Sequence, residues 1–228
     1  MSKKIIFITG ANGEMGHSLI NALNQQGVFN IVALDIDSQK YAFQVMKFIK
    51  GSILDTELLK YINNQYTIDA IYHLAAILST KAELNPLLAN DVNVNGTMNM
   101  FELCKKQSEN QKKVISFFFP SSIAVYNVLN NQNVIVDEYY NKETPITQYG
   151  KAKLKCEKIG IDYHNKSQLE GIDFRVIRFP GIISGTSVPT GGTSDYAPEM
   201  IHYAAQQKSY ECFVEKNRQL PFIVMPDA

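Results

Sequence analysis

The sequence predicts an α/β fold built on a doubly wound parallel sheet with helices on both of its faces. Two observations support this prediction. The apolar segments are short and almost entirely hydrophobic, as in strands that are covered on both sides. Longer stretches with helical spacing lie between them, so strand and helix alternate along the chain. The expected strands cover residues 5–9, 31–35, 70–74, 114–120 and 174–179.

The helices expected between these strands complete the alternation. The asparagine-rich run at 127–133 interrupts the pattern and predicts a polar insertion at the surface. The charged stretch at 151–158 predicts the solvated side of its helix, apart from Lys153. The expected helices cover residues 14–26, 55–66, 90–106 and 148–165.

The segment after residue 179 differs from the rest of the chain. Prolines and glycines at 180–181 and 189–192 indicate loops, and a helix is expected at about 197–207. We therefore expect a large sheet domain at 1–179 and a smaller, partial lobe at 180–228.

Charge and cysteine content narrow the class of protein. The 228 residues include 22 Lys and Arg and 22 Asp and Glu, so no basic excess favours nucleic acid or a membrane surface. The three cysteines are far apart, which indicates buried thiols in a reducing compartment. The first apolar run is too short for a signal peptide, and we expect a soluble cytoplasmic protein. The four histidines lack metal-ligand spacing, so no metal is expected.

Three glycines follow the first expected strand and open the first expected helix. Gly10 allows a tight turn, Gly13 lets the backbone approach a pyrophosphate, and Gly16 permits close helix packing. The N-terminus of the helix favours the anion. The turn, which includes Glu14 and Met15, therefore predicts a dinucleotide site.

Asp35 ends the second expected strand, nineteen positions after Gly16. Its carboxylate is expected to accept the hydroxyls of the adenosine ribose. The carboxylate would repel a 2′-phosphate, and no arginine lies nearby in the sequence, so NAD is expected rather than NADP. The alternative is an ordinary turn residue before Asp37 and Ser38.

Tyr149 and Lys153 are four residues apart, which places them on one face of an expected helix. A phenol has a pKa near ~10, and a nearby ammonium together with a nicotinium charge favours its phenolate. Tyr149 could then take a hydroxyl proton while a hydride leaves for nicotinamide. Ser122, at a strand end, could bind the reacting oxygen. The alternatives are an ordinary surface helix and an ordinary cap.

Together these residues resemble the extended short-chain dehydrogenase/reductase superfamily, which includes the UDP-sugar epimerases, and the resemblance covers essentially the whole chain. The segments 72–76, 93–97 and 178–181 carry it further. Ser52 departs from the pattern, because many relatives have aspartate there. The resemblance implies that the cofactor also contacts Ile53, Leu74, Ala75, Ala76, Asn93, Tyr149, Lys153 and Pro180.

A narrower set of segments, at 77–79, 180–184, 191–197 and 218–222, resembles the short-chain-type L-threonine 3-dehydrogenases. That resemblance implies a step of threonine catabolism, in which L-threonine is oxidised to 2-amino-3-ketobutyrate by an NAD-dependent oxidoreductase. It also implies a homodimer formed through a helix bundle. Tyr149 would be the base, and Lys153 would hold it and the nicotinamide ribose. The implied substrate contacts are Ser79, Ser122, Thr147, Tyr149, Gly192 and Thr193.

Two other functions remain open at this point. A nucleotide-sugar epimerase or dehydratase would need an arginine pair for a pyrophosphate, which is not evident. A non-catalytic NAD-sensing protein would not need Ser122, Tyr149 and Lys153. Because members of the threonine dehydrogenase group continue beyond the position of Ala228, we expect a fragment with an incomplete substrate lobe.

Overall fold

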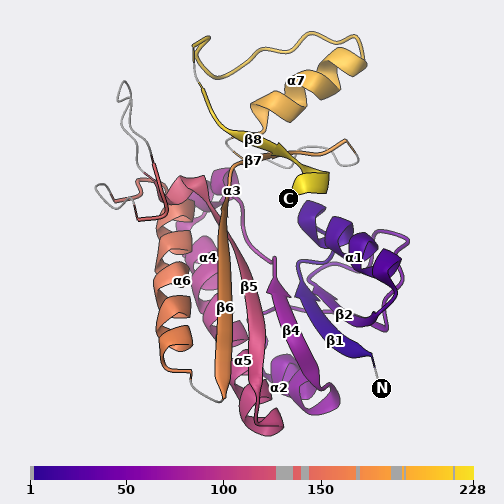
Figure 1. Cartoon of the computed structure of the whole chain (residues 1–228). Helices are drawn as coiled ribbons and strands as arrows, with labels where there is room; N and C mark the ends of the chain where they lie inside the picture. Colours follow the sequence, from indigo (N-terminus) through magenta and orange to yellow (C-terminus); the bar gives the residue numbers. More distant parts are fainter. Residues whose placement is uncertain are drawn as a thin grey trace.

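The fold is known from a computed structural model (Figure 1). It describes residues 3–126, 136–139, 144–167, 170–185, 192, 194–217 and 219–228. The predicted insertion at 127–133 therefore lies outside the described residues.

Six parallel strands form the central sheet, in the order β3-β2-β1-β4-β5-β6. The chain crosses over from the β3 edge to β4, so the carboxyl ends of β1 and β4 lie side by side at the switch point, where such sheets bind ligands. The predicted α/β class is confirmed. The strands are β1 (Lys4–Thr9), β2 (Phe29–Asp35), β3 (Lys47–Lys50), β4 (Ile68–His73), β5 (Val114–Ser122) and β6 (Gly171–Phe179).

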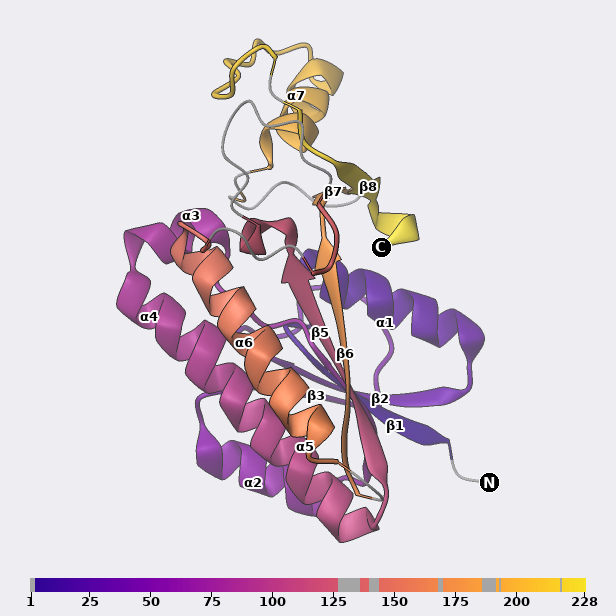
Figure 2. The same ribbon diagram turned by 60° about the vertical axis from the view of Figure 1, so that its left-hand side comes forward.

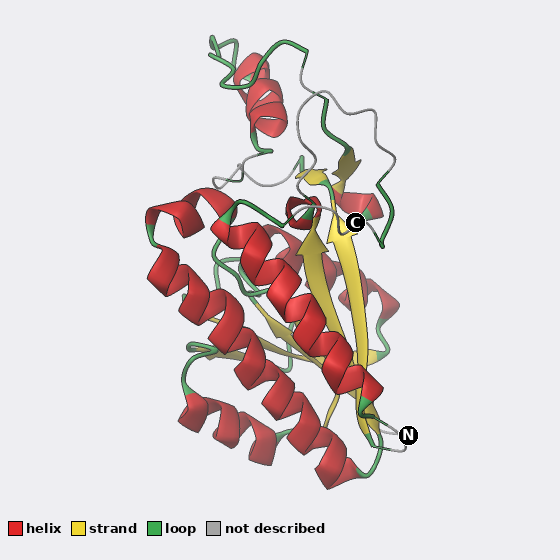
Figure 3. Cartoon of the chain, turned by 90° about the vertical axis from the view of Figure 1, so that its left-hand side faces the viewer, coloured by secondary structure: helices red, strands yellow, loops and turns green. Residues whose placement is uncertain are grey.

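Helices cover the two faces of the sheet unequally (Figures 2 and 3). Helices α2, α4, α5 and α6 form one layer, whereas α1 packs on the opposite face. Each layer has its own apolar core, centred on Phe101 and Phe117 in the first and on Ile8 and Ile20 in the second. The helices are α1 (Glu14–Gln26), α2 (Thr56–Gln65), α3 (Ser79–Leu84), α4 (Pro86–Asn90), α5 (Thr97–Gln111), α6 (Gln148–Asn165) and α7 (Tyr196–Ala205).

The prediction that every strand is covered on both sides is wrong for β6. Phe174 is buried against the α5 and α6 layer, but Ile177 on the other side is 50 % exposed. Helix α1 covers β1 and β2 and does not extend over β6, which leaves a cavity of about 1540 Å³ along this face. Its apolar lining includes Tyr72 and Phe118.

Short elements account for the other differences from the predicted pattern. The single helix expected at 90–106 is α4, a π-helical turn (Asp91–Gly96) and α5. Strand β3 was not predicted, since its four residues include two lysines, and α3 was not predicted either. Two 3₁₀ turns, at Ile123–Val125 and Met225–Asp227, complete the described elements.

After β6, β7 (Gly181–Ile183) pairs in parallel with β8 (Phe222–Val224). In Figure 1 these strands and α7 lie beyond the carboxyl ends of β5 and β6. The division into domains at residue 179 stays a prediction. Within the described residues, no helix combines the length and the hydrophobicity that crossing a bilayer requires.

Candidate active site

The three glycines form the turn between β1 and α1. Gly10 has a φ of 70°, in the region that favours glycine, and a Cβ there would lie 2.7 Å from the amide nitrogen of Ala75. A Cβ at Gly16 would collide with the carbonyl oxygen of Gly10. Helix α1 follows Gly13 without a side-chain cap hydrogen bond, so the first turn of α1 can offer backbone amides to an anion.

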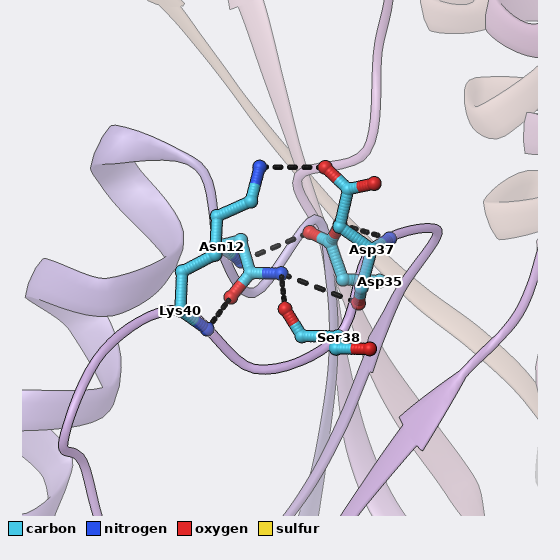
Figure 4. A network of polar contacts seen from close by, with 5 residues as sticks. All are labelled: Asn12, Asp35, Asp37, Ser38 and Lys40. Atoms are coloured by element: carbon cyan, nitrogen blue, oxygen red, sulfur yellow. Dashed lines mark hydrogen bonds and ion pairs between the residues drawn. The ribbon is translucent and has the colours of Figure 1, made fainter.

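A network of polar contacts joins this turn to the end of β2 (Figure 4). The Asp35 carboxylate accepts the amide of Asn12 at 2.9 Å and that of Asp37 at 3.1 Å. The Asn12 side chain donates to the Ser38 carbonyl at 3.0 Å and accepts the Lys40 amide at 2.9 Å. Asp35 is therefore held at the turn by main-chain donors, and its oxygens retain capacity for further hydrogen bonds.

The loop after β4 crosses directly over Gly10. The Leu74 amide donates to the Thr9 carbonyl at 3.2 Å, and the Ala75 amide donates to Thr9 Oγ1 at 3.3 Å. Asn93 fixes the far end of the loop, because its amide side chain accepts the Ile77 amide at 2.7 Å and donates to the Ile77 carbonyl at 2.9 Å. The predicted cofactor residues 74–76 thus lie on a loop that is held at both ends.

Ile53, one of the predicted cofactor contacts, is buried three residues after the end of β3. Its carbonyl accepts the side-chain amide of Asn99 at 3.0 Å. Ser52 Oγ accepts the Leu54 amide at 3.1 Å. Ser52, where the resemblance predicts aspartate, therefore makes a local turn contact.

A directed chain of hydrogen bonds passes through His73 beneath the loop after β4. Thr97 Oγ1 donates to the Asn93 carbonyl at 2.7 Å, so it accepts from His73 Nε2 at 2.9 Å. His73 Nδ1 then accepts from Thr9 Oγ1 at 2.8 Å. Both ring nitrogens are satisfied in this neutral tautomer, and complete burial, together with the nearby charge of Lys153, lowers the pKa of His73 to about 3.

Acid should therefore destabilise the fold through His73. The unfolded imidazole binds a proton below pH ~6.5, whereas the folded one stays neutral down to pH about 3. Between these values stability falls with falling pH, by at most about 1.4 kcal/mol per pH unit from this group. Urea unfolding at several pH values measures the slope, which His73→Gln should reduce. His202→Gln, on α7, is the control, and an equal reduction there would contradict the assignment.

Tyr149 and Lys153 lie in the first turns of α6. Lys153 is 4 % exposed, and its ammonium donates to the Pro120 carbonyl at 2.6 Å. The ammonium nitrogen lies 5.4 Å from the centre of the Tyr149 ring and 4.4 Å from that of Phe119. The lysine therefore lies beside the tyrosine, as the i, i+4 spacing predicts, and it links the tyrosine to the end of β5.

Ser122 ends β5 and begins the 3₁₀ turn Ile123–Val125. Its hydroxyl oxygen accepts the Ala124 amide at 3.1 Å, so it caps this turn and keeps its own proton to donate. A Cβ at Gly150 would collide with the Ala124 carbonyl, which shows that α6 packs closely on the turn. This contact brings the residue next to Tyr149 against the turn that Ser122 opens.

Burial opposes ionisation of both members of the tyrosine and lysine pair. It raises the pKa of Tyr149 to about 12 and lowers the pKa of Lys153 to about 8. Cys156 and Glu157 act on Lys153 in the opposite direction. The tyrosine is therefore protonated at neutral pH in the absence of a further positive charge.

A buried ion pair lies one helical turn beyond Lys153. Glu157 receives three charge-assisted hydrogen bonds from Arg178 on β6, at 2.7, 3.0 and 3.3 Å. Arg178 also donates to the Tyr126 hydroxyl and to the Glu138 carbonyl, each at 2.9 Å. Because Glu157 is 3 % exposed, the prediction that this side of the helix is solvated apart from Lys153 is wrong at this position.

The predicted substrate residues are not all in the described part of the chain. Ser79 is buried at the start of α3, and Thr147 accepts the Gly150 amide at 3.0 Å as the cap of α6. The Gly192 amide donates to Asp195 at 2.7 Å. Thr193 lies outside the described residues. The roles of these residues, and that of Pro180 between β6 and β7, stay predictions.

Sequence reasoning missed several residues of this region. Asn12 carries no motif, although an amide side chain in a turn signals capacity for both donor and acceptor contacts. Lys40 likewise carries no motif, because a lysine in a polar loop has no partner that the sequence specifies. Ser121 Oγ is buried and makes no hydrogen bond within the part of the chain that the structure describes, which adds an unused hydroxyl at the end of β5.

Comparison with known proteins identifies the family of the chain. A model of the NAD dependent epimerase/dehydratase family matches residues 6–228. The chain belongs to this family. The predicted resemblance is thereby confirmed, and the description of the family indicates a nicotinamide cofactor.

Relatives of this family member include both dehydrogenases and epimerase-like proteins. Bovine mitochondrial L-threonine 3-dehydrogenase is 32 % identical over 97 % of the chain, which spans 57 % of the bovine protein's length. An uncharacterised epimerase/dehydratase of Staphylococcus aureus (strain USA300) is also 32 % identical, over 99 % of the chain and 68 % of its own. A solved structure of a monomeric L-threonine 3-dehydrogenase from a metagenome database is 40 % identical, with a TM-score of 0.80, covering 97 % of this chain and 68 % of its own.

The residues present fit a nicotinamide dinucleotide. A Cβ at Gly10 would collide with the loop after β4 and one at Gly16 with the Gly10 carbonyl, so both positions need glycine for the tight turn at the N-terminus of α1. Gly10, Gly13 and the amides of α1 would hold the pyrophosphate, Asp35 the adenosine ribose, and Lys153 the nicotinamide ribose. When bound, the nicotinamide accepts a hydride and supplies a positive charge beside Tyr149.

Proposed function

We propose that this chain is the dinucleotide-binding and catalytic part of an NAD-dependent L-threonine 3-dehydrogenase. The placement of Lys153 carries the proposal, because its buried ammonium connects the Tyr149 ring to the end of β5 that bears Ser122. This is the same edge of the sheet that carries the glycine turn. Similar proteins with that name, at 32 and 40 % identity, support the choice of substrate.

In the proposed reaction Tyr149 takes the proton from the 3-hydroxyl of L-threonine while a hydride leaves C3 for NAD. The C3–H and O–H bonds break and a carbonyl forms, so 2-amino-3-ketobutyrate, NADH and one proton result. Ser122 donates a hydrogen bond to the reacting oxygen and orients it. Lys153 favours the phenolate of Tyr149 electrostatically, together with the positive charge of the oxidised cofactor.

We propose NAD rather than NADP on the basis of Asp35. Its carboxylate lies at the end of β2 and is oriented by the amides of Asn12 and Asp37. A 2′-phosphate beside it would bring like charges together in the cleft, whereas a 2′-hydroxyl would donate a hydrogen bond.

A nucleotide-sugar epimerase or dehydratase is the second candidate, and the Staphylococcus aureus relative favours it. The same tyrosine, lysine and serine would serve there, because that chemistry also begins with abstraction of a hydroxyl proton and hydride transfer. The outcomes differ, since an epimerase returns the hydride to its substrate and releases no NADH. A non-catalytic NAD-sensing protein is the third.

Calorimetric titration followed by an activity assay tests these candidates. NAD is titrated into the protein, and L-threonine, L-valine or UDP-glucose is then titrated into the complex. L-valine replaces the threonine hydroxyl by a methyl group, so the dehydrogenase should bind L-threonine more tightly and form NADH only with it. Binding of UDP-glucose in place of L-threonine would favour the epimerase. Failure to bind NAD would reject the proposal.

We further propose that the protein is cytoplasmic and forms a homodimer through the helical layer. Apolar side chains are exposed on neighbouring elements of this layer, among them Leu84 and Leu87, which are 81 and 82 % exposed on α3 and α4. Ile161 on α6 is 46 % exposed. Burial of such side chains would stabilise a dimer. Light scattering of the purified protein measures the state, and a monomer would contradict the proposal.

A further inference from the structure

We propose that the Asp37–Lys40 ion pair is a second determinant of dinucleotide choice, in which Asp37 occupies an ammonium that would otherwise be available to a 2′-phosphate. This inference rests on the proposed dinucleotide site. It concerns two residues of the loop after β2 that the fold and the predicted reaction leave without a role. Figure 4 shows both beside Asp35.

The geometry places Lys40 in the vicinity of the carboxylate that selects the ribose. The amide of Lys40 donates to the Asn12 side chain at 2.9 Å, and the amide of Asn12 donates to Asp35 at 2.9 Å. Asn12 therefore joins the phosphate turn, the end of β2 and the backbone of Lys40 in one unit. The loop carrying the lysine is held at the predicted adenosine site by hydrogen bonds.

The ammonium of Lys40 is engaged by Asp37. Its nitrogen lies 2.6 Å from the nearer carboxylate oxygen, and the side chains are 57 and 56 % exposed. This hydrogen bond lowers the pKa of Asp37 and raises the pKa of Lys40, so both are ionised at neutral pH. Lys50 also acts on Asp37, and Asp35 and Tyr41 act on Lys40.

The charge balance of the loop explains the expected selectivity. Asp35, Asp37 and Lys40 together carry one net negative charge, which disfavours a phosphate. Without the charge of Asp37, the net charge of these three side chains is zero. Asp35 is then the remaining carboxylate among the groups that act on the Lys40 ammonium. Because an exposed ion pair is weak, the lysine can change partner without a cost to the fold.

The test compares NAD and NADP binding by calorimetry for the unchanged protein and for Asp37→Asn, alone and with Lys40→Met. We expect Asp37→Asn to raise NADP affinity by about two- to fivefold, with little change for NAD, since an exposed charge pair contributes on this scale. Adding Lys40→Met should abolish the gain. The gain should also shrink at high salt. Repeating the comparison with Asp35→Asn brings weak NADP binding into the measurable range.

Glu57→Gln is the matched control, because Glu57 pairs with Lys60 at the same spacing and the same 2.6 Å distance on α2. An NADP gain in Asp37→Asn no larger than in this control would overturn the inference, and so would a gain that survives Lys40→Met. If one of these two results is found while the unchanged protein binds NAD, only this inference fails. If the unchanged protein binds neither dinucleotide, the proposed function fails with it.

Discussion

Tyr149→Phe is expected to lower kcat for threonine-dependent NADH formation by about 10²- to 10⁴-fold, the usual contribution of a positioned proton-transfer group. The ring stays in place next to Lys153, so its packing and the affinity for NAD should change little. Only the hydroxyl that takes the substrate proton is lost. Steady-state kinetics together with NAD titration separates these effects.

Tyr139→Phe controls for the loss of a tyrosine hydroxyl, because Tyr139 is 81 % exposed. Its kinetics should equal those of the unchanged protein. If Tyr149→Phe retains full activity, another group is the base. If neither the unchanged protein nor Tyr149→Phe has activity but both give the same phenotype, the non-catalytic NAD-sensing protein is favoured.

Arg178→Met is expected to have the largest effect on stability, about 3 kcal/mol or more, because it leaves the Glu157 carboxylate buried without its partner. The Glu157 side chain is 4 % exposed, so water cannot replace the guanidinium. The loss should appear as a lower urea midpoint with an unchanged slope. Adding Glu157→Gln should restore part of the stability, since the buried charge is then removed.

Arg175→Met is the matched control on the same strand. Arg175 pairs with Asp173 at 2.6 Å, but its side chain is 68 % exposed, so its loss should cost only about 0–1 kcal/mol. Equal effects of the two substitutions would contradict the importance of burial at Arg178.

The parts of the site that lie close together in the sequence could be predicted from it. The glycine turn follows from three residues within seven positions, and the pairing of Tyr149 with Lys153 follows from the helical repeat. The glycine turn and the Tyr149–Lys153 pair both depend on local backbone geometry, which a short segment of the sequence determines. Asp35 was placed correctly at the end of a strand because it directly follows the continuous apolar run at residues 31–34.

Contacts between distant residues could not be predicted in the same way. Glu157 and Arg178 are paired across the interface between α6 and β6, and only packing brings them together. The contact of Asn12 with Lys40 likewise depends on how the loop after β2 returns to the turn. The uncovered side of β6 was missed because hydrophobic residues in a strand do not specify how many helices lie over them.

The π-helical turn has a consequence for how the chain can tolerate changes in length. Such a turn corresponds to one surplus residue in an otherwise regular helix. The π-helical turn absorbs this residue locally, so deleting one residue between Asp91 and Gly96 would restore the regular repeat and leave the flanking helical turns in about the same phase. Asn93 lies inside the turn, and its side chain would then point in another direction and lose both hydrogen bonds to Ile77. The deletion is therefore expected to release the loop after β4 while leaving α4 and α5 in place.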